Sequence, residues 1–228
     1  MAQETESREE TPPVLAQDAA LSARAERKCA QLLDGAQAVI LARGFEGASV
    51  DDIAREAGIS KATMYRYYPD KAALFAAVMR RDCGRQSQGL FCDVAEDGPL
   101  EPLLVEFAVR FISFVLTPTA IGIFRNAAAE SERFPEIGQA FYASGLDRGR
   151  ARLAPLLAAA SARGEIEVDD ADLAAQRFFA LCQAGIFYKR LFGITPGYDD
   201  AAIAAHARGA VAAFLRMYRP DPDAAGRP

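Results

Sequence analysis

Histidine and cysteine, from which most transition-metal sites are built, are scarce in this chain. Its 228 residues include one histidine, His206, and four cysteines, Cys29, Cys83, Cys92 and Cys182. Because no two cysteines have C-x-x-C spacing, we expect no metal site and assign no role to His206. We expect free thiols that pack as small apolar residues in a reducing cytoplasm, with redox sensing by Cys83 and Cys92 as the alternative.

Recognisable catalytic signatures are also missing. The sequence contains no histidine with an acidic partner, no phosphate-binding glycine loop, and no serine or cysteine beside a base in a known motif. We therefore expect no catalytic residues and no cofactor. An enzyme, such as a helical hydrolase or lyase, is the least favoured of the functions considered.

Long apolar runs and alternating strand patterns are absent as well. The most apolar segment, residues 103–116, contains Glu106 and Arg110 and is too short to span a bilayer. The first residues are acidic and polar, unlike a secretory leader. Since helical periodicity continues along the chain and no segment alternates, the sequence predicts an all-α protein. Because neither a leader nor a membrane span is recognisable, we expect a cytoplasmic protein without a membrane partner.

The helical pattern divides into two domains between polar ends. Residues 1–23 and 219–228 lack sustained periodicity, and we expect disordered tails there. Cap and turn signals separate a head, 24–70, from a body, 71–218, with a linking helix over 71–85. The net charge of −5 divides into −4 for residues 1–23, +2 for 24–83 and −3 for 84–228, so the positive excess lies in the head and its linking helix.

The head contains a helix-turn-helix pattern between residues 49 and 71. Ser49 is a good N-cap, and apolar residues at 50, 53, 54 and 57 form one stripe of a short helix. Gly58 ends that helix, and Ser60 caps the next one three residues into the turn. Two short helices joined in this way place the second helix in the major groove of DNA.

The second helix of this pattern predicts a division between base reading and phosphate binding. Its first turn reaches base edges, which assigns base contacts to Lys61, Ala62 and Thr63. Hydroxyl and ammonium donors nearby suit phosphate oxygens. We assign phosphate contacts to Ser49, Ser60, Tyr65, Tyr67 and Lys71.

Residues 26–83 resemble the N-terminal DNA-binding domain of the TetR/AcrR family of bacterial transcription regulators. The resemblance runs through Gly44-Phe45, residues 49–54, Gly58-Ile59-Ser60, residues 63–71 and Ala73-Leu74-Phe75. Met64 and Tyr68 stand where leucine and phenylalanine are usual. Residues 123–137 resemble the C-terminal domain of an AcrR-like subgroup.

The resemblance implies nine helices and a homodimer that binds double-stranded DNA at a palindromic operator in the bacterial nucleoid. It also implies a repressor that a small-molecule effector releases. Among local signals, Asp70 should cap the fourth helix, Thr117 the sixth, and Asp199 and Asp200 should open the ninth. Pro155 predicts a kink or a new start in the seventh helix, and the eighth helix should begin at Asp169, Asp170 or Asp172 and reach Gly193. The last two helices are expected to form the dimer interface through Leu181, Tyr188, Phe192, Ile203, Ala210, Val211 and Phe214.

Aromatic and aliphatic residues of the body could line a cavity for an apolar or amphipathic effector. The candidates are Phe107, Phe111, Phe114, Ile121, Phe124, Phe141, Phe178 and Phe179. For each phenylalanine taken alone, ordinary core packing is the alternative. A solidly packed body would instead favour an effector-independent architectural or cell-cycle DNA-binding protein on the same fold.

Overall fold

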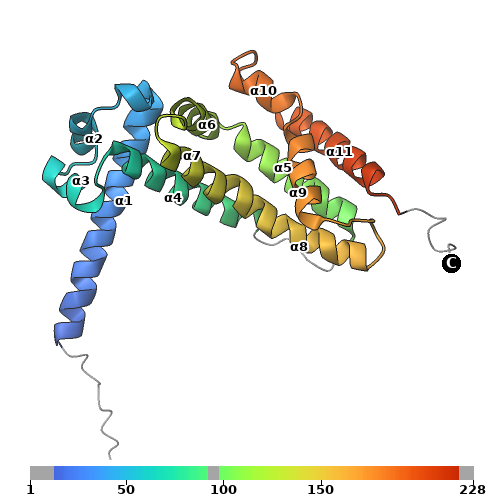
Figure 1. Ribbon diagram of the computed structural model, residues 1–228, viewed down its shortest axis with the longest axis horizontal. Coiled ribbons are helices and arrows are strands. Elements are labelled where there is room, and N and C mark those ends of the chain that lie inside the picture. Colours follow the sequence, from blue (N-terminus) through green and yellow to red (C-terminus); the bar gives the residue numbers. More distant parts are fainter. Residues whose placement is uncertain (1–12, 92–97, 221–228) are drawn as a thin grey trace, which may run out of the picture. The chain divides into compact units, whose positions relative to one another are not determined.

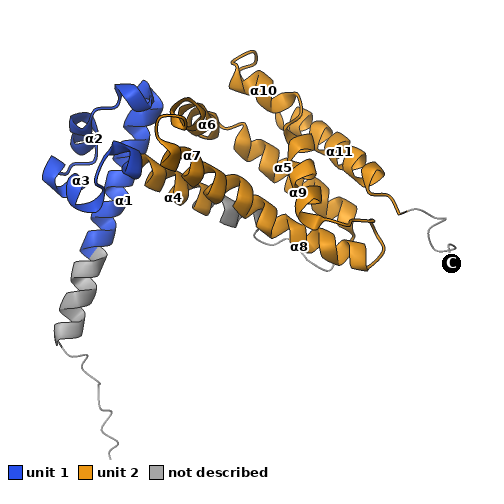
Figure 2. Ribbon diagram, viewed as in Figure 1, with its two compact units in different colours: residues 1–74 blue, residues 75–228 orange. Residues whose placement is uncertain are grey.

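A computed structural model describes residues 13–91 and 98–220, which form helices joined by short turns (Figure 1). These ranges contain no strand, so the predicted all-α fold is confirmed. The chain divides into two compact units, Met1–Leu74 and Phe75–Pro228 (Figure 2). The division falls inside the helix that was predicted to link head and body, and each unit has its own buried residues.

Unit 1 contains, within the described residues, α1 (Pro13–Gly47), α2 (Val50–Glu56), α3 (Lys61–Tyr67) and the start of α4 (Lys71–Phe91). Because α1 begins at Pro13, the expectation of a disordered tail through residue 23 is wrong from residue 13 onward; residues 1–12 lie outside the described residues. Leucine, alanine and glutamine follow Pro13. These residues favour a helix, and proline is well suited to its first position.

The short helices of unit 1 begin where the cap signals predicted. The Ser49 hydroxyl accepts a hydrogen bond from the Asp52 N–H at 3.1 Å, and the Ser60 hydroxyl accepts one from the Thr63 N–H at 3.1 Å. Each such cap stabilises its helix by about 1 kcal/mol. Gly58, between the helices, has a φ of +64°, a left-handed conformation that favours glycine.

The core of unit 1 forms where α1 and α2 pack closely. Ile40, Ile53 and Met64 are fully buried there. A Cβ atom on Gly35 would lie 2.7 Å from Ala57 N and 2.9 Å from Ala57 Cα, so a residue with a side chain would push the two backbones apart. This contact fixes α2, and through the short turn α3, against α1.

Unit 2 continues α4 and adds the remaining elements. They are α5 (Leu100–Val115), α6 (Pro118–Glu130), α7 (Pro135–Phe141), the π-helical turn η1 (Tyr142–Asp147), α8 (Arg148–Ala162), α9 (Ala171–Gln183), α10 (Ile186–Leu191) and α11 (Asp200–Met217). The predicted cap residues Thr117, Asp170 and Asp199 each accept a hydrogen bond from a backbone N–H in the first turn that follows.

Two body helices differ from the predicted ones. The predicted seventh helix does not begin afresh at Pro155, because α8 runs through that residue. The departure from α-helical hydrogen bonding lies earlier, in η1. The predicted eighth helix is broken into α9 and α10. Gly185, with a φ of +74°, stands between them, and a left-handed residue cannot continue a right-handed helix.

The core of unit 2 is built around α5, which packs against α9 and α11 (Figure 1). Phe107, Phe178 and Phe214, one from each of these helices, are almost completely buried. The ring of Phe178 lies 5.9 Å from that of Phe107 and 5.3 Å from that of Phe214. Among the described residues no single helix is long and apolar enough to cross a membrane; α5 and α6 meet that test only as a pair bent by 68°.

Candidate functional site

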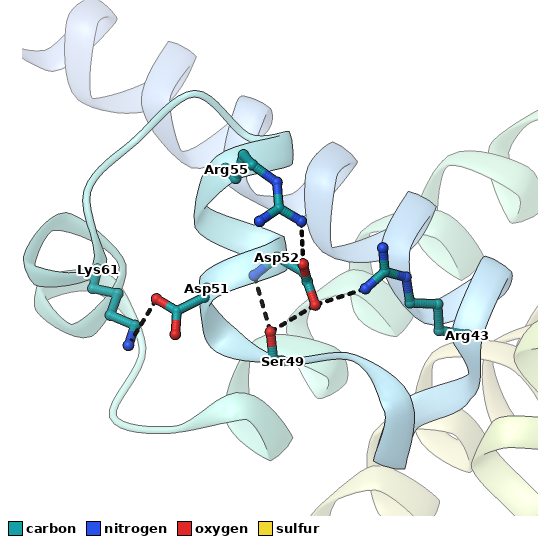
Figure 3. Close-up of polar contacts among 6 residues, drawn as sticks. All are labelled: Arg43, Ser49, Asp51, Asp52, Arg55 and Lys61. Atoms are coloured by element: carbon teal, nitrogen blue, oxygen red, sulfur yellow. Dashed lines mark hydrogen bonds and ion pairs between the residues drawn. The ribbon is translucent and has the colours of Figure 1, made fainter.

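Asp52, in the first turn of α2, is the centre of a polar cluster in unit 1 (Figure 3). The Ser49 hydroxyl donates to Asp52 Oδ2 at 2.7 Å and accepts from the Asp52 N–H. Arg43 Nη1 lies 2.7 Å from Oδ2, and Arg55 contacts Oδ1. The hydrogen bond from Ser49, followed by the two guanidinium groups, holds the pKa of Asp52 below its usual value. The carboxylate is thus ionised and fixes the start of α2.

Arg43 and Arg55 are surface cations that the sequence analysis did not select. Their side chains are 52% and 69% exposed, so they present guanidinium groups to solvent while each binds Asp52. Guanidinium groups of this kind suit phosphate oxygens. The spacing of Asp52 and Arg55 on one helix could have indicated their pairing. The pairing of Arg43 depends on the path of the chain around Gly44 and had no local signal.

The first turn of α3 exposes the predicted base-reading residues. The Lys61 side chain is 51% exposed, and its ammonium lies 2.7 Å from Asp51 Oδ1 (Figure 3). The hydrogen bond to Asp51 raises the pKa of Lys61, so the lysine is fully charged at neutral pH. Ala62 is exposed, whereas Thr63 is half-buried with its hydroxyl 2.9 Å from that of Ser60. In this structure both polar base readers therefore have partners within the protein.

Lys71, a predicted phosphate ligand, is bound inside unit 1. Its ammonium donates to the Phe45 carbonyl at 2.5 Å and lies 4.2 Å from the centre of the Phe45 ring. The side chain therefore ties the start of α4 to the end of α1. A phosphate contact by Lys71 stays a prediction, and it would have to share the ammonium with this carbonyl.

The tyrosines of α3 differ in their surroundings. Tyr65 is 51% exposed, and Tyr67 is half-buried with the Arg66 guanidinium 5.4 Å from its ring centre. Both hydroxyls are candidates for phosphate contacts, as predicted from the sequence. Tyr68, which stands where the family has phenylalanine, has its hydroxyl 3.4 Å from Cys29 Sγ.

A cavity of about 110 Å³ lies within unit 2. Its size is comparable to the ~150 Å³ apolar cavity that is known to hold benzene. The structure places six of the predicted pocket residues around it: Phe107, Phe111, Phe114, Phe124, Phe141 and Phe179. Edge-to-face contacts brace these walls, with ring centres 4.8 Å apart for Phe111 and Phe179 and 5.6 Å apart for Phe124 and Phe141.

Two predicted pocket residues do not line this cavity. Phe178 is completely buried among other core side chains, and Ile121 is only 2% exposed to solvent. Sequence spacing could not show which of the adjacent residues Phe178 and Phe179 lines the cavity. The two side chains point in different directions, and what each one meets depends on how the helix packs against its neighbours. The lining also includes polar residues that the sequence analysis did not select, among them Asp82, Thr119 and Gln183.

The cysteines described by the structure are free. Burial raises the pKa of the Cys83 thiol, and burial raises that of Cys182 to about 12. Both groups are therefore thiols at neutral pH, and a thiol is a poor nucleophile compared with a thiolate. Cys92, the second member of the proposed redox pair, lies outside the described residues.

The predicted dimer interface needs correction. Val211 and Phe214 have no exposure to solvent within a single chain, and Ile203 and Ala210 are each 7% exposed. All four side chains belong to the core of unit 2, and Val211 and Phe214 offer no surface to a second copy. By contrast, Tyr188 and Phe192 are 56% and 74% exposed, and Leu181 is half-buried. The sequence pattern identified an apolar stripe on α11 correctly but assigned it to the wrong partner.

Two regions of the chain match known protein families. Residues 32–78, which contain the helix-turn-helix, match the bacterial regulatory proteins of the tetR family. Residues 102–220, which make up most of the body, match the C-terminal domain of AefR-like transcriptional repressors. Each match therefore covers the unit in which the corresponding candidate site lies.

Individual relatives agree with these matches. The chain is 30% identical over 141 residues to the HTH-type transcriptional regulator EthR of Mycolicibacterium smegmatis, a match that covers 59% of this chain and 61% of EthR, less than two thirds of its length. A TetR-family regulator from Mesorhizobium loti has a similar structure, with a TM-score of 0.80 and 28% identity over 86% of this chain and 99% of that one. The flavonoid-responsive regulator FrrA has a TM-score of 0.73 and 31% identity over 86% and 98%. The chain belongs to the tetR family of bacterial regulatory proteins, which are DNA-binding transcription regulators.

Proposed function

We propose that this chain is a repressor that binds a palindromic operator as a homodimer in the nucleoid of the bacterial cytoplasm. A small apolar or amphipathic molecule that enters the cavity of unit 2 releases it from DNA. In this proposal Lys61, Ala62 and Thr63 read bases. Arg43 and Arg55 join the predicted phosphate ligands, because both are exposed beside the start of α2.

The observation that carries this proposal is the course of α4. This single helix includes Lys71, which is bound to the end of α1 in unit 1, and Asp82 and Cys83, which line the cavity in unit 2. A ligand that displaces one part of a continuous helix also shifts the other part. Occupation of the cavity can therefore alter the start of α4, which follows the recognition helix α3 after a short turn.

The cavity also favours an effector-controlled regulator over an effector-independent one. A solidly packed body would have supported the second function, whereas this body holds a cavity with seven phenylalanines in its wall. Its size suits a small molecule of one or two rings. The relative FrrA is described as flavonoid-responsive, which is consistent with an aromatic effector.

The proposed dimer uses the outward faces of α9, α10 and α11. Apolar side chains are exposed on these helices and beside them, and soluble monomers seldom expose large apolar patches. They are Leu173, Tyr188, Phe192, Ile194 and Met217. On α11 the exposed positions 201, 205 and 209 are alanine, alanine and glycine, so a partner helix could approach closely along this side.

The proposal is tested by measuring operator binding and ligand response in the same protein. An operator would be selected from random duplexes, and small aromatic compounds would be screened for release of the labelled operator in fluorescence anisotropy. Ala120 lies in the cavity wall, so Ala120→Phe should fill the cavity and abolish release while operator affinity is retained. Ala128→Phe, on the exposed side of the same helix, is the matched control and should respond normally.

Two results would contradict this function. One is that compounds bind the protein without any change in operator affinity, since linkage requires ligand and DNA to weaken each other by the same factor. The other is that Ala120→Phe and Ala128→Phe respond alike. Either result would favour an effector-independent DNA-binding protein.

A further inference from the structure

Asp82 is an ionisable residue in the wall of an otherwise largely apolar cavity. The residue is 9% exposed and lies on α4. Its Oδ1 atom accepts a hydrogen bond from Arg81 Nε at 2.9 Å. Its Oδ2 atom is buried, and no hydrogen-bond donor for it exists among the described residues.

A buried carboxylate oxygen without a donor is unfavourable. Leaving a buried acceptor unsatisfied destabilises a protein, and the destabilisation is larger when the group is charged. Native structures rarely retain such a group unless it has a function or meets a partner that is not part of the protein. Because Asp82 lines the cavity, the missing donor can come from a molecule inside it.

The other walls limit what that molecule can be. Phenylalanines surround the space, and glycines at 145 and 149 keep it open. A Cβ atom on Gly149 would lie 3.1 Å from Phe179 Cζ, so the backbone approaches this ring closely. Such walls favour an apolar and preferably aromatic body, while Asp82 Oδ2 offers a single strong acceptor for one polar group.

The charges of Asp82 and Arg81 limit which polar group the ligand can carry. An anionic ligand would face the Asp82 carboxylate, and repulsion between like charges is strong where water is excluded. A cationic ligand would approach the Arg81 guanidinium, which already neutralises Asp82. A neutral hydroxyl supplies the missing donor without either conflict.

We propose that the effector is a neutral, apolar molecule with a hydroxyl group, and that this hydroxyl donates a hydrogen bond to Asp82 Oδ2. This inference rests on the proposed function, in which an apolar effector fills the same cavity. Asp82 is then the residue that determines effector specificity. Since it belongs to α4, the hydrogen bond connects the ligand directly to the helix that continues into unit 1.

The test compares three probes that differ only in one group. They are 4-ethylphenol, which donates a hydrogen bond, its methyl ether 4-ethylanisole, which does not, and the anion 4-ethylbenzoate. Binding to the full chain is measured by isothermal titration calorimetry at neutral pH, where the phenol is un-ionised. We expect 4-ethylphenol to bind at least about tenfold more tightly than the ether, because a hydrogen bond to a charged group is lost, and we expect the benzoate to bind most weakly.

Variants then test whether Asp82 causes the difference in affinity between the probes. Asp82→Asn should bring phenol and ether to within about threefold of each other and improve binding of the benzoate. The matched control, Asp172→Asn, makes the same change at an exposed position and should bind the three probes as the unaltered chain does. Thermal unfolding of each variant shows whether it is folded, and the comparison of probes on the unaltered chain does not depend on any variant.

The outcomes separate this proposal from the proposed function. Equal binding of phenol and ether to the unaltered chain, with loss of both in Ala120→Phe, overturns the role of Asp82 but leaves an apolar effector cavity in place. Unchanged discrimination in a folded Asp82→Asn variant overturns it as well. If none of the three probes binds, the hydroxyl proposal is wrong, and the operator-release screen decides the proposed function on its own.

Discussion

At the residue scale, the two lysines of the helix-turn-helix have different partners within the protein. Lys61 pairs with Asp51, and both side chains are more than half exposed. An exposed pair of this kind is screened by solvent and contributes little to stability, so a base edge can compete for the lysine. Lys71 instead binds the Phe45 carbonyl and ring, which makes it part of the packing of unit 1.

Substitutions at these lysines should therefore have separable effects. Lys61→Ala should weaken operator binding by about 1–3 kcal/mol and relax sequence preference, because it removes a base contact. Lys71→Ala should weaken operator and random DNA alike, reduce the magnitude of the salt slope by roughly 0.9 and also lower the stability of unit 1. Anisotropy titrations over a range of salt concentrations, with thermal unfolding of both variants, measure these quantities.

Asp51→Asn is the useful companion to these variants. It frees Lys61 and removes a negative charge near the DNA, so affinity for all duplexes should rise. Equal loss of sequence discrimination in Lys61→Ala and Lys71→Ala would show that the assignment of bases and phosphates is wrong.

At the element scale, the orientation of the helix-turn-helix depends on the contact between α1 and α2. Capping by Ser49 and Ser60 determines where α2 and α3 begin, but it does not determine what they pack against. Gly35 determines how α2 packs against α1, because its lack of a side chain allows the backbone at Ala57 to approach α1. The position of α3 thus depends on a residue outside the motif itself.

Gly35→Ala should disturb this packing. The added methyl group would meet backbone atoms at 2.7 and 2.9 Å, which cannot move as a side chain can, and overpacking of this kind costs roughly 1–3 kcal/mol. We expect a lower midpoint of thermal unfolding and weaker operator binding, measured by circular dichroism and anisotropy. Gly47→Ala, where the nearest contact is at 3.4 Å, should leave both unchanged or raise stability slightly. Similar behaviour of the two variants would argue against the close-approach explanation.

At the scale of the whole molecule, operator recognition requires two copies of α3. Dimers of helix-turn-helix proteins bind half-sites about 34–36 Å apart or a multiple of this distance. The buried positions of Val211 and Phe214 exclude them from the contact between copies. Exposed residues such as Phe192, directly after α10, and Ala205, on α11, take their place in the proposed interface.

Charges introduced at these exposed positions should separate the copies without unfolding them. Phe192→Asp combined with Ala205→Glu should give a monomer in sedimentation with near-normal helicity, and operator affinity should fall by roughly 10²–10⁴-fold because the second half-site no longer contributes. Ala128→Glu, also exposed, is the control and should sediment and bind normally. Phe214→Asp should instead unfold unit 2. A monomeric double variant that still binds the operator tightly would refute the dimer proposal.

The sequence by itself determined the features that depend on neighbours along the chain. Ser49, Ser60, Asp70, Thr117 and Asp199 begin helices as predicted, since an N-cap bonds to an N–H only two or three residues away. The all-α class and the family followed from the same local patterns. Gly185 breaks the predicted eighth helix without a clear local signal, because the sequence does not show whether a glycine allows close packing or adopts a left-handed conformation.

Only the tertiary structure decided which apolar faces meet each other and which polar atoms are left without partners. A stripe on α11 reads the same whether it covers α5 and α9 or a second copy of the chain, and packing in three dimensions assigned it to the core. Phe178 and Phe179 are adjacent, yet only Phe179 lines the cavity. The burial of Asp82 Oδ2 likewise has no signature in sequence, because solvation depends on contacts between residues far apart in the chain.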